Sequence, residues 1–259
     1  MSVTGLEDKT VLVTGSSKGI GRGVVVESAR AGANVVINHR DSEAEAGEAR
    51  RIVEDLGRKA IVVRADLGVQ SDVDAMFEEA IDTFGGVDVA VHSAYYSYRE
   101  FAVDLPFDEW KRTIDVSLSG AFLMAQHTAR DLIRRGMSGS IIFIGSIQAI
   151  RCPPRSAPYN SAKNGLRGLT YTLACELAPH GIRVNLIEPG WIDTPGERKY
   201  ATQQQIDEGA KDLPFKRLGT PEEIANGVLF LASDMGSYVS GETLRIDAAT
   251  WLPRAHHRL

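Results

Sequence analysis

Short apolar runs recur along the chain and alternate with longer stretches that have a helical pattern of apolar and polar positions. The runs are rich in Val and Ile and nearly continuous, which is typical of parallel strands buried on both faces. They predict strands at Thr10–Thr14, Asn34–Asn38, Ala60–Arg64, Val87–His92, Ser140–Ile144, Arg183–Ile187 and Thr243–Asp247. The stretches between them predict helices at Gly19–Ala31, Glu43–Leu56, Ser71–Phe84, Phe107–Arg135, Tyr159–Ala178 and Pro221–Ala232.

Strands separated by helices indicate right-handed crossovers between parallel strands. We therefore expect an α/β protein in which residues 1–259 form a single doubly wound, Rossmann-type domain, with a seven-stranded parallel sheet and helices on both faces. One long stretch, about residues 190–217, is polar and charged and carries no clear strand or helix pattern. A loop of this length in a compact domain more often has a function than serves only as a connection, so we expect a substrate lid there.

Composition and charge narrow the class of protein. Hydrophobic residues make up 43% and charged residues 24% of the chain, which is ordinary for a globular protein, and the net charge of −5 does not favour nucleic acid or an anionic membrane as a partner. The first residues lack a secretory signal pattern, and two cysteines are too few for a disulfide framework. We expect a cytoplasmic protein that acts on a small molecule and holds no metal.

A glycine-rich turn, TGSSKGIG at positions 14–21, follows the first predicted strand. Glycines let the backbone turn sharply and approach a pyrophosphate, and the free N–H groups of the next helix favour the phosphates. After the first strand of a doubly wound sheet this turn predicts dinucleotide binding, although a tight strand–helix connection alone could look the same. The expected cofactor contacts in the turn are Gly15, Ser16, Ser17, Lys18, Gly19, Ile20 and Gly21.

Three residues around the fifth predicted strand could carry out proton transfer. Tyr159 and Lys163 are four positions apart, so they share one face of a helix. A phenol has an ordinary pKa of about 10, and an ammonium held nearby lowers that pKa, so the Tyr can exchange a proton with a carbonyl or alcohol oxygen. Ser146 lies just past the strand end and could hydrogen-bond the same oxygen. In isolation the pair could equally be a Tyr and a Lys on a half-exposed helix.

Taken together, these motifs resemble the short-chain dehydrogenases/reductases over nearly the whole chain. The resemblance rests on TGSSKGIG at 14–21, Asp66, VHSAY at 91–95, Ser146, YNSAK at 159–163, Arg-Val-Asn and Pro-Gly within 183–190, Thr194 and the strand from Gly241 to Asp247. Ser146 precedes Tyr159 by thirteen positions, as in this family. The stretch VVINHRDSEAEA is also similar to the corresponding stretch of bacterial glucose dehydrogenases. The resemblance implies an oxidoreductase that transfers a hydride between a nicotinamide and a carbonyl or secondary alcohol.

The resemblance also implies roles for individual residues. Ser146 would polarise the substrate oxygen, Tyr159 would act as acid and base, and Lys163 would lower the pKa of Tyr159 and bond the nicotinamide ribose. Ser117 stands where the family has an Asn that holds a water in the proton relay, and its hydroxyl would take that role. The other implied cofactor contacts are Asp66, Leu67, Ser93, Ala94, Tyr95, Pro189, Gly190, Ile192 and Thr194. Tyr95 replaces a family glycine, and Ala248-Ala249 replaces a Gly-Gly pair.

The end of the second predicted strand favours NADP over NAD, although NAD is possible. NAD-selective relatives place an acid there to bond the ribose, and that acid would repel a 2′-phosphate. Here the position holds His39, followed by Arg40, and Lys18 adds a second cation from the glycine turn.

The polar lid, with Tyr95, Tyr96, Tyr98 and Trp191 near the pocket mouth, favours a small polar substrate such as a sugar or polyol. One alternative is a 3-oxoacyl-carrier-protein reductase, for which Arg130, Arg134 and Arg135 could bind the acidic carrier. Another is a nucleotide-binding sensor without catalysis. A helical stripe of Ala162, Leu166, Leu169, Leu173 and Leu177, together with the family resemblance, predicts a homotetramer.

Overall fold

A computed structural model describes residues 5–252; residues 1–4 and 253–259 of the predicted domain lie outside this range. Within it, seven strands form one parallel sheet in the order β3-β2-β1-β4-β5-β6-β7. The strands are β1 (Thr10–Thr14), β2 (Asn34–His39), β3 (Ala60–Arg64), β4 (Val89–His92), β5 (Gly139–Ile144), β6 (Ile182–Pro189) and β7 (Thr243–Ile246). This architecture confirms the predicted doubly wound fold.

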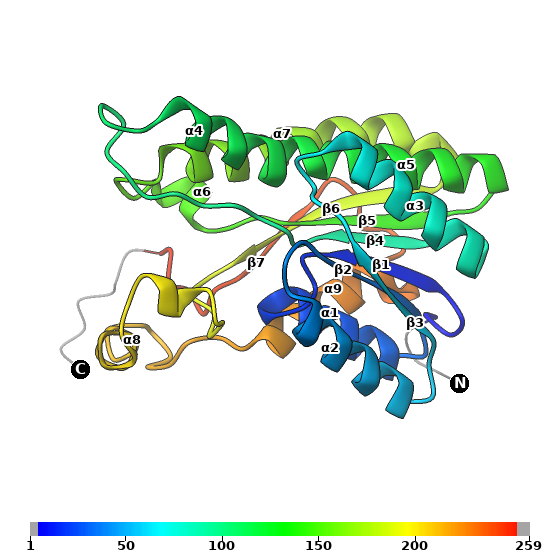
Figure 1. The fold of residues 1–259 in the computed structure, drawn as a ribbon, viewed down its shortest axis with the longest axis horizontal. Helices are drawn as coiled ribbons and strands as arrows, with labels where there is room; N and C mark the ends of the chain where they lie inside the picture. Colours follow the sequence, from blue (N-terminus) through cyan, green and yellow to red (C-terminus); the bar gives the residue numbers. More distant parts are fainter. Residues whose placement is uncertain (1–4, 253–259) are drawn as a thin grey trace.

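Helices cover both faces of the sheet, so the strands are sandwiched between two helical layers (Figure 1). One layer contains α1 (Gly19–Arg30), α2 (Glu43–Asp55) and α9 (Pro221–Ala232); the other contains α3 (Gln70–Phe84), α4 (Phe107–Ile114), α5 (Gly120–Arg135) and α7 (Ala157–Leu177). Alternate strand residues face the two layers: Leu12 belongs to the core under α3 and α5, and Val11 and Val13 belong to the core under α1 and α9. Burial on both faces explains why the strands read as unbroken apolar runs.

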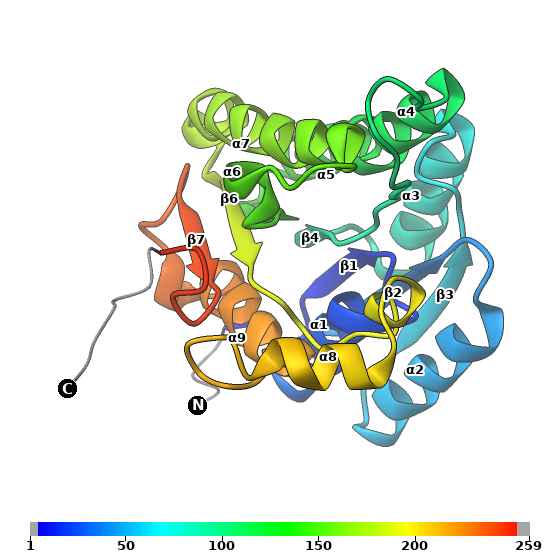
Figure 2. The same cartoon turned by 90° about the vertical axis from the view of Figure 1, so that its left-hand side faces the viewer.

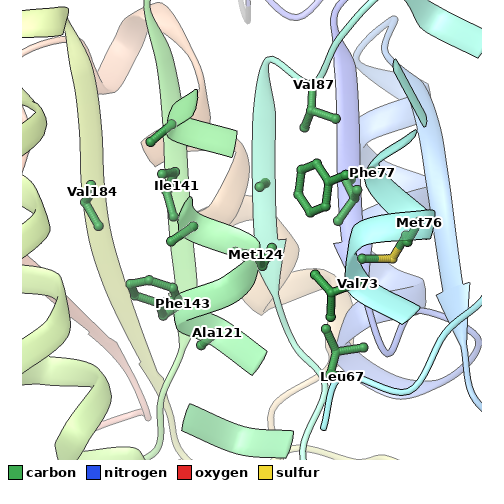
Figure 3. Close-up of a cluster of buried hydrophobic side chains, with 14 of the residues drawn as sticks. Leu67, Val73, Met76, Phe77, Val87, Ala121, Met124, Ile141, Phe143 and Val184 are labelled. Carbon is green, nitrogen blue, oxygen red and sulfur yellow. The ribbon is translucent and has the colours of Figure 1, made fainter. Parts of the chain in front are cut away.

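Large side chains fill the core between the sheet and the α3–α5 layer (Figure 3). Phe77 from α3 and Met124 from α5 belong to the same core as Ile141 and Phe143 of β5, and all four side chains are buried. Burying a side chain of this size stabilises the fold by about 1.5–3 kcal/mol. This packing fixes the strand ends from which the loops of the site emerge.

Helices α1 and α9 pack closely on the opposite face, although they are far apart in the sequence. A Cβ added at Gly23 of α1 would lie 3.0 Å from the backbone carbonyl oxygen of Pro221, the first residue of α9. The helix that follows the glycine turn is therefore held in place by one of the last elements of the chain.

The predicted helix Phe107–Arg135 is divided into α4 and α5 by a π-helical segment, Asp115–Ser119. A π turn accommodates one extra residue, and such turns are frequent at functional sites. The backbones pack tightly where α5 begins: a Cβ added at Gly120 would lie 2.6 Å from the carbonyl oxygen of Leu67. Apolar periodicity across α4 and α5 is too coarse to reveal this single insertion.

The stretch 190–217 is not wholly irregular, which corrects the sequence-based expectation. It contains a short turn of 3₁₀ helix, Glu197–Lys199, and the helix α8 (Gln203–Ala210). The Thr202 side chain accepts the backbone N–H of Gln205, and the Gln205 side chain accepts the backbone N–H of Thr202. This reciprocal cap is a sequence signature of a helix start that the polar composition of the stretch obscures. Figure 2 shows α8 on the same side of the sheet as α1 and α9.

Among residues 5–252, no helix combines the length and the apolar character needed to cross a membrane.

Candidate active site

The strand order reverses between β1 and β4, and this reversal determines where a ligand can bind. In open parallel sheets, ligands lie outside the carboxyl ends of the strands at such a switch point. A cavity of about 780 Å³ lies there, and its wall contains the glycine turn, the strand ends, the start of α7 and the lid. Ser146, Tyr159 and Lys163 line the same cavity as Gly15, Gly19 and Gly21.

The glycine turn packs backbone against backbone, as a pyrophosphate cradle requires. A Cβ added at Gly15 would lie 2.7 Å from the Cα of Ala94, and one added at Gly21 would lie 2.5 Å from the Gly15 carbonyl oxygen. Helix α1 begins at Gly19 with no side-chain cap and no acidic residue in its first turn. Its free N–H groups and positive dipole end therefore face the cavity, and they fit the phosphates of a dinucleotide.

Two predicted cofactor contacts do not line the cavity. The Ser16 hydroxyl is buried and donates to the carbonyl oxygen of Val13 at 2.7 Å. His39 is 5% exposed, and its Nδ1 accepts the backbone N–H of Ser42 at 3.2 Å. Both side chains instead hydrogen-bond the backbone of neighbouring turns.

Two cations line the cavity near the end of β2, as predicted. The Lys18 ammonium lies 2.6 Å from the Glu45 carboxylate, and the Arg40 guanidinium pairs with Asp41. All four side chains are well exposed, so these pairs are weak.

Asn38 is a site residue that sequence reasoning missed. Its side-chain oxygen accepts the Gly15 N–H at 2.9 Å, and its amide nitrogen donates to the Ala65 carbonyl oxygen at 3.0 Å. It thereby ties the glycine turn to the end of β3. The signal was a buried amide at the end of an apolar strand, where a hydrophobic residue would otherwise be expected.

Asp66 lines the cavity just after β3, and its carboxylate already has two partners. It accepts the Gly68 N–H at 2.9 Å and a hydrogen bond from Arg112 of α4 at 2.5 Å. Burial raises the pKa of Asp66 and the Arg112 hydrogen bond lowers it; the net pKa lies below the ordinary value. Asp66 therefore presents a fixed anion to the adenine side of the predicted cofactor site. No sequence motif marks Arg112 as its partner.

Thr14 joins the glycine turn to the end of β4. Its hydroxyl oxygen accepts the N–H groups of Ser93 and Ala94, both at 3.1 Å, and lies 3.1 Å from Nδ1 of His92. The hydroxyl proton is therefore directed to His92. Burial, and then the charge of Lys163, lower the pKa of His92 to about 3, so the ring is neutral. Ser93 and Ala94 are thus held at the cavity wall, as predicted.

The three predicted catalytic residues meet at the far end of the cavity. The Gln148 N–H donates to the Ser146 oxygen at 3.1 Å, which leaves the Ser146 proton available. The Lys163 ammonium donates to the carbonyl oxygen of Ile144 at 2.6 Å and lies 5.5 Å from the centroid of the Tyr159 ring. Helix α7 thus presents both side chains from one face, beside the end of β5.

The expected effect of Lys163 on Tyr159 is not found in the unliganded protein. Burial raises the pKa of Tyr159 far above its ordinary value, Tyr95 adds to this, and the Ser146 hydrogen bond opposes it. Burial also lowers the pKa of Lys163 to about 7, so the nearby cation is itself weakened. The protein alone therefore holds Tyr159 as a neutral phenol, which is the proton-donating form.

Ser117 lies in the π-helical segment, and its side chain does not reach the cavity. Its hydroxyl oxygen accepts the Tyr96 N–H at 3.0 Å and its proton is directed to the Tyr96 carbonyl oxygen at 3.3 Å. Because the hydroxyl is fully buried and already paired, it holds the loop after β4 in place. The proton relay expected at Ser117 therefore stays a prediction, and these contacts give the hydroxyl a positioning role.

Tyr95 occupies the space beside Tyr159 that a glycine at this position would leave open. Its ring meets that of Tyr159 edge-on, with centroids 6.0 Å apart and planes at 77°. Its hydroxyl lies 2.6 Å from where a Cβ at Gly196 would be, so it touches the lid backbone. Tyr95 therefore bridges Tyr159 and the lid.

The rest of the substrate side combines aromatic and charged groups. Trp191 donates its ring N–H to Glu197 at 2.8 Å, and the Arg99 guanidinium lies 3.7 Å from the centroid of the Tyr200 ring. These four side chains line the cavity, and so do Pro189, Gly190, Ile192 and Thr194. Tyr98, predicted at the mouth, does not line it.

The sequence matches that of several characterised proteins along almost its full length. 3beta-hydroxysteroid dehydrogenase 1 of Eggerthella lenta is 39% identical over 248 residues, which cover 95% of each chain. L-rhamnose 1-dehydrogenase (NAD(P)(+)) of Sphingomonas sp. is 38% identical, over 95% of this chain and 98% of the relative. Glucose 1-dehydrogenase 2 of Bacillus subtilis is 33% identical, over 95% of this chain and 96% of the relative.

Solved structures and a family profile agree with these relatives. A short-chain type dehydrogenase/reductase from Mycobacterium marinum superposes with a TM-score of 0.88 at 32% identity, covering 97% of this chain and 98% of its own. The profile described as enoyl-(acyl carrier protein) reductase matches residues 15–248. The protein therefore belongs to the short-chain dehydrogenase/reductase family, oxidoreductases that act on CH–OH and C=O groups with NAD(P).

Proposed function

We propose that this protein is an NADP(H)-dependent oxidoreductase that interconverts a carbonyl and a secondary alcohol on a small polar compound, such as a sugar or polyol. The observation that carries this proposal is the composition of the cavity. Ser146 and Tyr159 share it with the glycine turn, and the substrate side presents Arg99 and Glu197. Of the three relatives described above, two are named for sugars and one for a steroid, so their names do not decide the substrate class. The charged residues on the cavity wall are what favour a polar substrate.

The side chains are arranged to handle one proton at the substrate oxygen. Tyr159 as a neutral phenol donates its proton to a carbonyl oxygen during reduction, and in its deprotonated form it takes the proton of the substrate hydroxyl during oxidation. The Ser146 hydroxyl, which also hydrogen-bonds Tyr159, can donate its proton to the same substrate oxygen. Lys163 has N–H groups beyond the one bonded to Ile144, and these can reach a ribose hydroxyl. A bound nicotinamide supplies or accepts the hydride.

A substrate panel tests the proposal. We expect cofactor turnover, followed by nicotinamide absorbance, with sugars and polyols in preference to small ketones, an acetoacetyl thioester and a 3β-hydroxysteroid. Tyr159→Phe should lower kcat by far more than tenfold, a factor that corresponds to about 1.4 kcal/mol in the activation barrier. Cofactor binding, measured by fluorescence, should stay intact. Preferred turnover of the steroid, or a Phe variant with more than about a tenth of the activity, would contradict the assignment.

The preference for NADP is supported by Lys18 and Arg40 on the cavity wall. Their present partners, Glu45 and Asp41, form exposed and therefore weak pairs, so a 2′-phosphate can displace them through charge-assisted hydrogen bonds. We expect kcat/KM for NADPH to exceed that for NADH by at least about tenfold.

Arg40→Leu should reduce kcat/KM for NADPH and leave that for NADH nearly unchanged. Arg50→Leu is the matched control, because Arg50 pairs with Glu54 on α2 and does not line the cavity. His39 is left unchanged because its buried ring supports the turn before α2. If the unmodified enzyme uses NADH as well as NADPH, the preference is refuted.

The carrier-protein reductase is the second candidate, and the description of the family profile favours it. The predicted basic patch is less available than expected, because Arg134 and Arg135 both pair with Asp131, at 2.7 and 2.9 Å. The acetoacetyl thioester in the panel decides this candidate. A nucleotide sensor would bind the cofactor and turn over none of the compounds, which the intact Tyr159 and Lys163 disfavour.

We also propose a homotetramer, because the family resemblance implies one and several large apolar side chains are exposed on the helices of this protein.

A further inference from the structure

Arg99 is an arginine on the substrate side of the cavity that takes part in no ion pair within residues 5–252. Two nearby arginines are paired: Arg155 lies 3.9 Å from Glu100, and Arg198 lies 2.9 Å from Asp193. Arg99 instead stacks on the ring of Tyr200 at 3.7 Å. Stacking leaves the guanidinium edge, with its N–H donors, free to bind a ligand.

The Tyr200 ring, on which Arg99 stacks, is itself held in place. The Tyr200 hydroxyl donates to the Ser97 carbonyl oxygen at 3.2 Å, which joins the lid to the loop after β4. Arg99 comes from that loop and Tyr200 from the lid, so the pair spans the cavity mouth. A guanidinium held on a ring loses less conformational freedom on binding than one extended into solvent.

Arg99 and Tyr159 line the same cavity, so one substrate can contact both side chains. The positive charge of Arg99 opposes the burial that raises the pKa of Tyr159, and it acts on Tyr95 in the same way. A substrate whose reacting oxygen contacts Tyr159 can therefore extend its other end towards Arg99.

Glu197 limits where an anionic group can lie. One of its carboxylate oxygens accepts the Trp191 ring N–H at 2.8 Å, and the charge repels an anion placed beside it. The same carboxylate can accept hydrogen bonds from substrate hydroxyls. The wall therefore presents a cation at one place and a hydroxyl acceptor at another.

We infer that Arg99 binds a carboxylate of the substrate and that the enzyme prefers a polyhydroxylated acid, of the sugar-acid type, over a neutral sugar or polyol. This inference rests on the proposed function and names its substrate class. Arginine and carboxylate form two parallel hydrogen bonds, which fix orientation as well as adding affinity. Most exposed arginines are only solvated; Arg99 differs in being stacked, unpaired with any carboxylate of residues 5–252 and on the cavity wall.

The test compares gluconate with sorbitol, which share a carbon skeleton and differ at one end by a carboxylate in place of a hydroxymethyl group. Glucuronate and glucose form a second pair of the same kind. With the oxidised cofactor at saturation, we expect kcat/KM for each acid to exceed that for its neutral partner by at least about tenfold. Where turnover is too slow, calorimetry on the cofactor-saturated enzyme compares the binding of the two compounds.

Arg99→Gln should remove the preference for the acid mainly through KM, while Arg99→Lys should keep part of it because the charge remains. Arg155→Gln is the control: it removes a charge near the same loop but does not line the cavity, and the acid-to-neutral ratio should stay unchanged. Circular dichroism and cofactor binding check that the variants fold.

Two results would overturn the inference and leave the proposed function standing. One is turnover of neutral sugars or polyols equal to or better than that of the acids. The other is an acid preference that survives Arg99→Gln. Binding of neither acid, with turnover confined to steroid or thioester substrates, would overturn the inference and the proposed function together.

Discussion

At the scale of single residues, burial affects the pKa values of Tyr159 and Lys163 more strongly than neighbouring charges do. Sequence spacing places Tyr159 and Lys163 on one helix face, and the structure agrees. Spacing says nothing about how completely the two groups lose water, and that loss shifts the pKa of each towards its neutral form. Spacing likewise does not show that the side chains of His39 and Ser16 are buried away from the cavity, because their burial depends on how neighbouring turns pack.

Lys163 should make stability depend on pH. Its pKa falls from 10.5 to about 7 in the folded protein, so between these values the unfolded chain carries a proton that the folded one lacks. The free energy of unfolding therefore increases as pH rises from about 7 to 10.5, and this increase is lost again as pH falls towards 7. Lys163→Met should therefore stabilise the protein most near pH 7, and the gain should shrink by about 1.4 kcal/mol per pH unit above it.

Urea unfolding of both proteins at about pH 7.5, 8.5 and 9.5 measures that difference. A gain that stays constant with pH would mean that Lys163 keeps its ordinary pKa in the folded protein.

Ser117 should prove to be a positioning residue. Ser117→Ala leaves the Tyr96 N–H without its partner, which should cost about 1–3 kcal/mol in the free energy of unfolding. The pH profile of kcat should keep its shape, because the hydroxyl does not face the cavity. A profile that changes while stability does not would restore the relay role that the family resemblance implies.

At the scale of elements, the strands and most helices could be predicted, because burial on both faces leaves a strong apolar signal. Val11, Leu12 and Val13 illustrate this, since all three are buried in a single short strand. The π-helical segment could not be predicted, because one inserted residue hardly disturbs the periodicity of α4 and α5. Helix α8 was missed although Thr202 and Gln205 mark its start, because its exposed residues lack an apolar face.

The junction between the π-helical segment and α5 should not tolerate a side chain at Gly120. Gly120→Ala would press its Cβ against the backbone of Leu67, which lines the cavity, and should destabilise the protein by about 1–3 kcal/mol. Cofactor binding should weaken with it. Gly47→Ala on α2 is the control: no atom lies within 4 Å of the added Cβ, so the helix should gain about 0.5–1 kcal/mol. Thermal unfolding of both variants distinguishes a clash from a general effect of replacing glycine.

At the scale of the whole molecule, the stripe on α7 faces mainly inward. Ala162, Leu166 and Leu177 are buried in the protomer's own core, and Leu169 and Leu173 pack against that core. Helical periodicity identified an apolar face, but it could not decide what that face packs against. Phe122 of α5 and Tyr171 of α7 are instead 42% and 48% exposed, and they are better candidates for contacts between protomers.

A homotetramer should be measured by light scattering at micromolar concentration. Phe122→Glu and Tyr171→Glu should lower the molar mass, because a charge buried at an interface is costly. Leu56→Glu, which alters an exposed apolar residue at the end of α2, should leave the mass unchanged. A monomeric unmodified protein would refute the proposed assembly.

The packing of α1 against α9 has a consequence for synthesis on the ribosome. A nascent chain that stops before Pro221 already contains the glycine turn, Ser146, Tyr159 and Lys163. It nevertheless leaves the apolar face of α1 uncovered and β6 without its neighbour β7. An uncovered face and an open strand edge both promote aggregation. Premature termination late in translation should therefore yield insoluble protein and no partial activity, even though every proposed catalytic group has been made.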